Sequence, residues 1–326
     1  MRQVAELHYD IVRQIGVGAG ANSIVFEAHD PAVGRTVAVK HIAKHHLTAQ
    51  GVTKFFLEAE AMFAARHPNV VELIVGANLP DDVVLMMPLY SRGSLADRIK
   101  NAPLSARAVG RIAQEILLGV ARVHIAGFIH LDIKPSNVLF SDRDNALLSD
   151  FGQSRMMDVN GVAEWPWMYP AALPPEYFIN AAATPQSDVF QVALTLYRAL
   201  NGDRFFTQQV TERLATYGGD ITALAAAGAT VIDPRRFMPH VPRGLRRVLR
   251  RALSFDPAAR QSSAEEMAKQ LAAVSVHLDW AAQPRTGGGC QWSVARPSGV
   301  TWLVELVPEG GGRYGVRTWT VNVSGK

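Results

Sequence analysis

The spacing of the apolar residues changes along the chain, and this change limits the fold more than any other feature of the sequence. In residues 11–42, runs such as "RTVAVKHIA" alternate as strands do. Residues 52–66 have the period of a helix, and residues 69–90 return to a strand pattern. Beyond about residue 90 the pattern is mostly helical, and Ser105 can cap a helix that ends before Gly127. This order predicts an α+β protein with a strand-rich lobe followed by a helix-rich lobe.

The last part of the chain has a different character. The glycine-rich stretches "TGGG" and "EGGGR" separate three strand-like runs, "CQWSVAR", "VTWLVELV" and "YGVRTWTVNV". We expect a small antiparallel sheet appended to the main body. The predicted units are a strand-rich lobe, a helix-rich lobe and the appended sheet, which span residues 1–87, 88–275 and 276–326.

The appended sheet carries tryptophans and arginines, which allow two interpretations. Rings such as Trp302 and Trp319, with Arg296 and Arg317 nearby, can stack on the bases of a nucleic acid. We favour core packing and cross-strand pairs, and no nucleic-acid partner, because the segment has no basic stripe. Both faces of "VTWLVELV" are largely apolar, so one is expected to pack on the helical lobe and the other to bind a partner or a second copy.

Composition is typical of a globular protein in a reducing compartment. Of the 326 residues 48% are hydrophobic, and 33 basic and 29 acidic residues leave a net charge of only +4. The single cysteine, Cys290, excludes an internal disulfide. No run approaches the ~18 apolar residues of a membrane span, and "MRQVAELHYD" lacks the apolar centre of a signal peptide. We therefore expect a soluble, cytoplasmic protein without a membrane partner.

Two motifs of the strand-rich lobe can bind phosphate. In "GVGAGANSIVFEA", Gly18 and Gly20 let backbone amides approach a polyphosphate, with Ser23 at the place of a third glycine; a plain hairpin is the alternative. Lys40 ends the apolar strand "VAVK" and needs an anionic partner if it is buried. Glu58 on the next helix can supply that partner. Both charges have a simpler interpretation as solvated side chains.

The segment "HLDIKPSN", residues 130–137, brings an acid, a base and an amide close together. Asp132 can accept a proton from an attacking hydroxyl, and Lys134 can neutralise charge on a transferring phosphoryl group. Asn137 offers an amide oxygen to a hard cation such as Mg²⁺. His130 is expected to be structural rather than a general base.

A second acidic motif, "LLSDFGQS", follows a short apolar strand. Its Asp150 precedes Phe151 and the permissive Gly152. A carboxylate at this place can bind Mg²⁺ that bridges phosphates, although an ordinary turn aspartate would give the same pattern.

In their order and spacing these motifs resemble the signature set of the eukaryotic-like Ser/Thr protein kinases, including the soluble bacterial members. The resemblance covers about residues 10–275 and implies the bilobal protein kinase fold. The matching positions, in chain order, are G-x-G-x-x-S-x-V at 18–25, V-A-V-K ending at Lys40, Glu58, H-x-D-x-K-P-x-N from His130 to Asn137, D-F-G from Asp150 to Gly152, P-P-E ending at Glu176, S-D-V-F with Asp188, and "FDPAAR" ending at Arg260.

The resemblance also implies a role for each matching residue. Asp132 is the catalytic base, and Lys134 stabilises the transferred phosphoryl group. Lys40 holds the α- and β-phosphates of ATP and is itself held by Glu58. Metal ligands are Asn137 and Asp150, for Mg²⁺ or alternatively Mn²⁺. Residues expected around ATP are Gly18, Gly20, Ser23, Val25, Ala38, Lys40, the gatekeeper Met87, Leu89 of the hinge, and Leu139. Structural or regulatory residues are His130, Leu131, Phe151, Gly152, Tyr169, Glu176, Asp188 and Arg260, with Met62 and Leu73 completing an apolar spine.

The chain departs from the family pattern in four respects. Leu131 stands where most relatives have an arginine that needs a phosphate on the activation loop. The segment 153–175 has no threonine. We therefore expect a kinase that does not depend on activation-loop phosphorylation, although it can autophosphorylate. Tyr169 replaces a threonine that braces the catalytic aspartate and lysine, and Pro88 replaces an acidic hinge residue, so both put the details of specificity in doubt.

Three functions are compatible with these residues. The favoured one is an ATP- and Mg²⁺-dependent kinase of Ser/Thr in protein substrates, because "KPSN" is typical of Ser/Thr specificity. A pseudokinase that serves as a binding module is the second, against which the retained Lys40, Asp132 and Asp150 argue. A small-molecule phosphotransferase of similar fold is the third, against which Glu176 and Arg260 argue.

Overall fold

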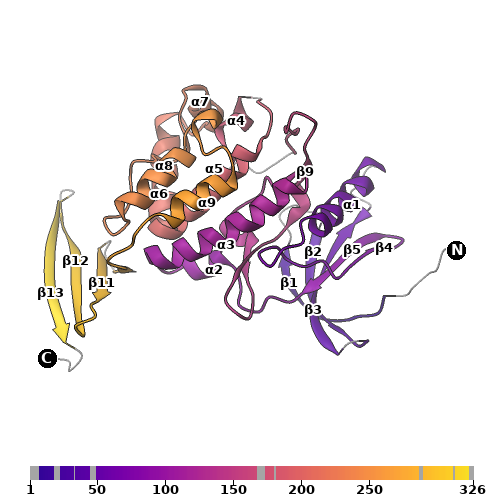
Figure 1. Cartoon of the computed structure of the whole chain (residues 1–326), viewed down its shortest axis with the longest axis horizontal. Helices are drawn as coiled ribbons and strands as arrows, with labels where there is room; N and C mark the ends of the chain where they lie inside the picture. Colours follow the sequence, from indigo (N-terminus) through magenta and orange to yellow (C-terminus); the bar gives the residue numbers. More distant parts are fainter. Residues whose placement is uncertain are drawn as a thin grey trace.

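The computed structural model describes residues 7–17, 23–32, 34–44, 49–166, 173–179, 181–285, 289–310 and 313–322. In this part of the chain three bodies follow one another along the long axis (Figure 1). An N-terminal sheet with one helix lies at one end, a helical body lies in the middle, and a separate C-terminal sheet lies at the other end. The expected Gly18, Gly20 and Tyr169 lie outside the described residues.

The N-terminal sheet has five antiparallel strands in the order β1-β2-β3-β5-β4. Its register sets Val25 opposite Lys40, and Ala38 opposite Met87. Four consecutive residues of the central strand, 37–40, are buried, which is why a lysine at the end of this run needs partners. The elements of this part are β1 (Asp10–Val17), β2 (Ser23–Asp30), β3 (Arg35–Ala43), α1 (Ala49–Ala64), β4 (Val75–Asn78) and β5 (Asp82–Pro88).

The helical body is built around two long helices, α3 and α5. The side chain of Ser105 caps α3 by accepting a hydrogen bond from the backbone of Ala108, and Gly127 follows its end with φ of 84°, a conformation that favours glycine. Nearly every residue of α5 is buried, as its continuous apolar pattern predicts. The helices of this body are α2 (Leu95–Ile99), α3 (Ala106–Ile125), α4 (Pro175–Phe178), α5 (Pro185–Asn201), α6 (Asp203–Thr216), α7 (Ile221–Ala226), α8 (Arg243–Ala252) and α9 (Ala264–Ala272).

Two short strand pairs hold the loops between these bodies. They are β6 (Phe128–Ile129) with β9 (Arg155–Met156), and β7 (Val138–Phe140) with β8 (Ala146–Leu148). One apolar core runs from the N-terminal sheet through α1 into α3 and α5, so the loops are fixed relative to both bodies.

The C-terminal sheet has four antiparallel strands, one more than the sequence predicts. The order is β10 (Ala281–Pro284), β11 (Cys290–Ala295), β12 (Val300–Gly310) and β13 (Arg313–Asn322). The additional strand, β10, has the sequence "AAQP", which lacks the branched and aromatic residues that indicate strands. Figure 1 shows β13 as the outermost element of the molecule, on the side away from the helical body.

The buried side chain of Trp292 anchors this sheet to the helical body. Trp292 is only 4% exposed, and its Nε1 donates a hydrogen bond to Nδ1 of His240 at 2.9 Å. Next to it, Asp279 accepts hydrogen bonds from the Ser105 hydroxyl and the Arg107 backbone at the start of α3. The core interpretation of the tryptophans is therefore confirmed at Trp292.

No helix in the described part of the chain combines the length and the apolar character that crossing a bilayer requires.

Candidate functional site

A cavity of about 500 Å³ lies between the N-terminal sheet and the helical body. Its walls come from segments far apart in the sequence, which the common core brings together. Its lining residues include Ile15, Gly16, Val25, Ala38, Lys40, Glu58, Met62, Val71, Met87, Pro88, Leu89, Tyr90, Lys134, Ser136, Asn137, Leu139, Ser149 and Asp150. Of the described residues that the sequence predicts around a nucleotide, Ser23 alone is not on this wall: it begins β2.

Lys40 lies at the centre of a buried ionic network. Its Nζ donates to Oε1 of Glu58 and to Oδ1 of Asp150, both at 2.8 Å. Burial disfavours the charge, but the two carboxylates outweigh it and hold the pKa of Lys40 above its ordinary value. Burial also raises the pKa of Glu58, against the attraction of Lys40. The cleft therefore contains a fixed ammonium group at neutral pH.

The backbone at Asp150 is in a conformation that residues with a side chain rarely adopt. Asp150 has a left-handed backbone with φ of 61°. A Cβ at Gly152 would come within 3.4 Å of Asp150 Oδ1 and 3.5 Å of Glu58 Oε2. The loop therefore approaches the ion pairs closely. Burial opposes ionisation of Asp150, but nearby Lys40 holds the pKa of its carboxyl below the usual value.

Asp132 is the centre of a second network, which reaches the wall of the cleft through Lys134 and Asn137. Lys134 Nζ lies 2.9 and 2.8 Å from its two carboxylate oxygens. The Nδ2 of Asn137 donates to the backbone oxygen of Asp132 at 2.9 Å and to its Oδ2 at 2.8 Å. Burial raises the pKa of Asp132 despite Lys134, which makes the carboxylate a better proton acceptor near neutral pH. The sequence predicts this acid, base and amide as a group, and they do lie together.

Helix α5 fixes the loop that carries Asp132. The buried carboxylate of Asp188 accepts hydrogen bonds from the backbone amides of His130 at 2.8 Å and Leu131 at 2.9 Å. The sequence does not single out Gln191, whose Oε1 accepts from the Ile133 amide at 3.0 Å and whose Nε2 donates to the Leu131 carbonyl at 2.7 Å. The signal for it was an amide in an otherwise apolar, fully buried stretch of helix.

His130 has the environment of a structural residue. It is completely buried, and its ring meets that of Phe151 edge to face with 4.7 Å between centroids. Burial lowers the pKa of its imidazole. Met62, Leu73 and Phe151 belong to the same continuous core.

Leu131 lies in a small apolar cluster instead of a charged one. The cluster contains Ile129, Leu131, Ala163, Leu173 and Ala183, and all five are buried. Trp165 packs beside it: its ring meets Tyr177 at 5.4 Å between centroids, and its Nε1 donates to the Ala181 carbonyl at 2.7 Å. Part of the segment after Asp150 is thus fastened to the helical body by apolar contacts.

Glu176 and Arg260 form a fully buried ion pair. The guanidinium donates to the two carboxylate oxygens at 2.8 and 2.7 Å, and also to the carbonyls of Gln186, Ser254 and Phe255. Every donor has an acceptor, so the pair ties the first turn of α4 to the segment before α9.

The oxygens of this cleft suit a divalent cation that is completed by phosphate. Asp150 uses Oδ1 for Lys40, so its Oδ2 can bind a metal, and Asn137 offers Oδ1, which accepts only a long hydrogen bond of 3.3 Å from the neighbouring Ser136 hydroxyl. The described residues contain no group of three or more His, Cys, Asp or Glu side chains that could hold a metal. A Mg²⁺ ion here would therefore take its remaining ligands from phosphates and water, as Mg²⁺ commonly does.

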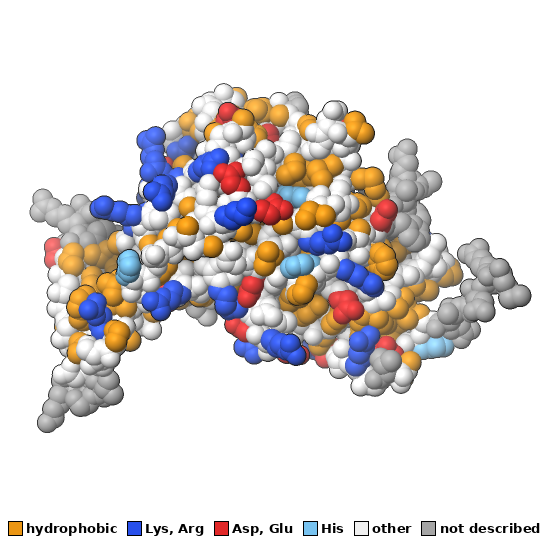
Figure 2. All heavy atoms as spheres, in the orientation of Figure 1, with side chains coloured by type: hydrophobic (Ala, Val, Ile, Leu, Met, Phe, Trp, Pro, Cys, Tyr) orange, Lys and Arg blue, Asp and Glu red, His pale blue; other side chains and the backbone are white. Residues whose placement is uncertain are grey.

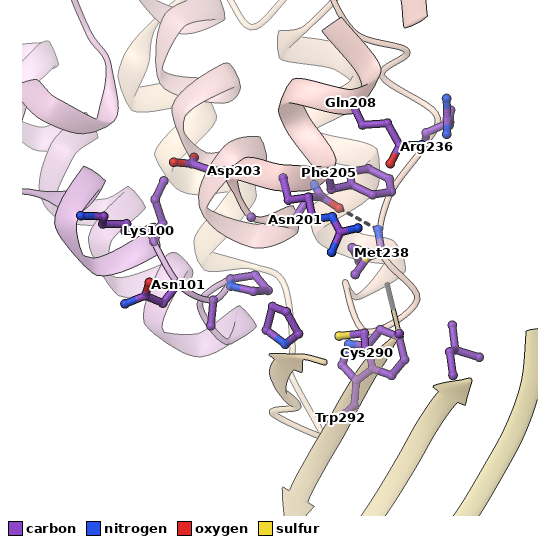
Figure 3. Close-up of a pocket in the computed structure, with 18 residues that line it drawn as sticks. Lys100, Asn101, Asn201, Asp203, Phe205, Gln208, Arg236, Met238, Cys290 and Trp292 are labelled. Atoms are coloured by element: carbon purple, nitrogen blue, oxygen red, sulfur yellow. Dashed lines mark hydrogen bonds between the residues drawn. The ribbon is translucent and has the colours of Figure 1, made fainter. Parts of the chain in front are cut away.

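A larger cavity, of about 760 Å³, lies between the end of α2, helix α6 and the C-terminal sheet (Figure 3). Three of its polar side chains are already engaged: Asn201 accepts from the Met238 amide at 2.7 Å, Asp203 pairs with Arg198, and Arg236 pairs with Glu212. Basic side chains gather over the same side of the helical body (Figure 2). The hydrogen-bonded network of Lys40, Glu58 and Asp150 lies in the smaller cleft, which is the candidate site.

The comparisons with known proteins identify the family. The model of the protein kinase domain family matches residues 9–272. The chain is 28% identical over 276 residues to "Serine/threonine-protein kinase PknK" of Mycobacterium tuberculosis, which is 82% of this chain and 24% of the relative. It is 29% identical over 269 residues to "Serine/threonine-protein kinase PknL" of Mycobacterium bovis (81% and 65%), and 27% identical over 264 residues to "Serine/threonine-protein kinase PrkC" of Bacillus subtilis (79% and 39%). The chain thus spans between about a quarter and two thirds of the length of these relatives.

Proposed function

The chain belongs to the protein kinase domain family, and from this premise we propose that it is an ATP- and Mg²⁺-dependent kinase that phosphorylates Ser or Thr of protein substrates. The observation that supports this most is the meeting of Lys40, Asn137 and Asp150 on the wall of one cavity, with Asp132 hydrogen-bonded directly behind Asn137. The proposed units are the lobes 1–87 and 88–275 and the extension 276–326. The single cysteine supports a reducing, cytoplasmic location.

Each group has a defined task in this mechanism. Asp132 orients the hydroxyl of the acceptor residue and takes its proton while the oxygen attacks the γ-phosphorus. The bond from that phosphorus to the leaving ADP oxygen breaks in the same displacement. Lys134 lies 2.8 Å from Asp132 and neutralises charge on the moving phosphoryl group. Lys40 holds the α- and β-phosphates, and its two carboxylate partners fix its position.

The divalent ion and the adenine ring of ATP would be held by different residues of the cleft. A divalent ion, Mg²⁺ or alternatively Mn²⁺, would be held by Asn137 and Asp150 and would neutralise the phosphate oxygens. Val25, Ala38 and Leu139 would sandwich the adenine ring. Met87 would act as gatekeeper, and Leu89 would offer backbone groups to the base.

We further propose that this kinase is active without phosphorylation of its activation segment. The supporting observation is the buried apolar cluster at Leu131: this residue stands in place of the arginine that a phosphate would neutralise. The ion pair of Lys40 and Glu58 is formed at the same time. Protein treated with phosphatase should keep its rate, whether or not it can autophosphorylate. A large loss of activity that returns on phosphorylation would contradict the proposal.

Protein rather than small-molecule substrates are supported by the buried pair of Glu176 and Arg260, which stabilises the helical lobe next to the cleft. In relatives of this fold that lobe binds the peptide. The test is transfer of labelled phosphate from ATP to generic protein substrates and, in parallel, to sugars and aminoglycosides. Labelling of small molecules alone would favour a small-molecule phosphotransferase.

The decisive variant is Asp132→Asn, with Asp142→Asn as its matched control on the exposed turn after β7. Transfer to protein should fall by a factor of about 10³ or more in the first and stay unchanged in the second. Binding of ATP should persist in both. If the unmodified protein binds ATP but transfers no phosphate to any protein, the pseudokinase alternative is correct. If phosphate transfer is observed, a phosphoproteomic comparison of cells with the intact chain and cells with Asp132→Asn would identify the substrates.

A further inference from the structure

The edges of the two large sheets differ in how they are protected. An edge strand exposes unpaired backbone groups, and proteins shield such edges by bulges, shortness, proline or lysine. In the N-terminal sheet, β1 has two register shifts and β4 has only four residues. In the C-terminal sheet, β10 has four residues and ends in Pro284. These three edges are poor templates for another strand.

Strand β13 is longer and more regular than these edges, although its pair with β12 has one bulge near the start, between Pro308 and Gly310, and the strand carries Arg313 and Arg317. It has ten residues, contains no proline, lysine or acid, and pairs with β12 in regular register from Tyr314 to Asn322. Apolar side chains on it are open to solvent: Val316 is 64% exposed, Trp319 38% and Val321 37%. Val316 points to one face of the sheet, while Trp319 and Val321 point to the other. In Figure 1 nothing covers the outer side of β13 in the described part of the chain.

From these observations we propose that two copies of this chain associate through β13, edge to edge and antiparallel, to form one continuous sheet with four strands from each copy. Two identical antiparallel strands are related by a two-fold axis perpendicular to the sheet, so each face continues into the same face of the partner. Opposed residues must then both have odd numbers or both have even numbers, so one residue faces its own copy and the axis lies midway between the two.

An axis at Thr318 makes β13 complementary to itself. Arg317 then lies opposite Trp319 of the second copy, and the reverse contact occurs by symmetry. The same pair of residue types is already in contact within this sheet, where the guanidinium of Arg296 lies 4.3 Å from the ring centroid of Trp302. Glu305, opposite Arg317 on β12, balances the charge on that face.

The second copy is favoured over an open chain of copies because the opposite edge is closed. A head-to-tail assembly would need β10 to accept β13, but β10 is short and ends in proline. When β13 of one copy pairs with β13 of the other, the open edge of each copy is covered, so the assembly stops at two copies. The N-terminal sheet, whose residues line the cleft, lies on the other side of the helical body from β13 (Figure 1), so the proposed dimer leaves the cleft of each copy open.

The test is the mass of the full chain in solution, measured by sedimentation equilibrium from about 1 to about 100 μM. The unmodified chain should form a dimer. Thr318→Lys places two ammonium groups opposite each other at the axis and should weaken the dimer by roughly tenfold or more. Thr318→Glu should act in the same way. An equimolar mixture of the two variants should recover the dimer, which separates charge repulsion at the axis from a folding defect.

Two matched controls complete the experiment. Ala281→Lys puts the same charge on β10, the other edge, and should leave the dimer intact. Trp319→Ala should weaken the dimer, whereas Trp302→Ala, a tryptophan of equal exposure (39%), should not. A monomer at every concentration, a dimer that resists Thr318→Lys, or a variant mixture that fails to associate would overturn the proposal.

Discussion

The two antiparallel sheets of this protein have the same local structure and opposite surroundings. The central strand β3 of the N-terminal sheet is buried on both sides, so the protonated form of Lys40 must be stabilised by the carboxylates of Glu58 and Asp150. The C-terminal sheet buries mainly its β11 side, where Trp292 docks on His240, and leaves β13 open. The comparison teaches that burial, rather than strand sequence, decides the role of a sheet. A buried strand can hold a charged group in place for catalysis, whereas an open edge can contact another chain.

The largest expected effect tests the charge on the first sheet. Lys40→Met leaves two buried carboxylates without their cation, so the rate of phosphate transfer should fall by a factor of about 10² or more. Lys44→Met, a few residues further along, is the control, since Lys44 only donates to the carbonyls of Leu79 and Pro80. Initial rates at saturating ATP give the answer. Equal rates in the two variants would remove Lys40 from the mechanism.

The second effect tests the anchor of the C-terminal sheet. Trp292→Ala removes a buried ring and the donor to His240, which should lower the free energy of unfolding of the docked sheet by about 3–5 kcal/mol. Trp302→Ala should cost less than about 1 kcal/mol, because the ring is partly exposed.

The thiol of Cys290 reports this undocking directly. Burial raises its pKa to about 11, so the docked thiol reacts slowly. Labelling by a thiol reagent should accelerate in Trp292→Ala while the rate of phosphate transfer stays the same. Loss of both together would mean that the two sheets form one cooperative unit.

The third effect is the response of the anchor to acid. Burial lowers the pKa of His240 to about 4, from an ordinary 6.5. Above pH 6.5 both states are neutral and the docking is fully stable. Between pH 6.5 and 4 the imidazole of His240 binds a proton in the undocked state but stays neutral in the docked state. The free energy of docking therefore weakens by about 1.4 kcal/mol per pH unit at most, or roughly 3 kcal/mol in total. Tryptophan fluorescence at a series of pH values measures this, and His240→Gln should abolish the slope.

The smallest effect concerns a partly exposed ion pair of the C-terminal sheet. Arg285 lies 3.7 Å from Glu305, with side-chain exposures of 49% and 21%. Glu305→Gln should change the free energy of unfolding by less than about 1 kcal/mol, and less still in high salt. Chemical denaturation at two salt concentrations checks this. A larger change would mean that charge contributes to this sheet as it does to the first.

Much of the fold was accessible from the sequence because local patterns carry it. The alternation in β3, the Ser105 cap and the apolar α5 predicted their elements correctly. Strand β10 was missed because "AAQP" forms a strand only by pairing with β11. The role of Gln191 was missed for a similar reason: its partners are backbone groups of a loop about 60 positions away.

The candidate site divides in the same way. The sequence by itself determined which residues carry charge and in what order, and this sufficed for the family and for the local group of Asp132, Lys134 and Asn137. Only the tertiary structure decided that Lys40 meets Asp150, 110 positions later, and that Leu131 lies in an apolar cluster. The physical reason is that helix and strand patterns arise between near neighbours, whereas ion pairs, buried clusters and open edges depend on how distant segments pack.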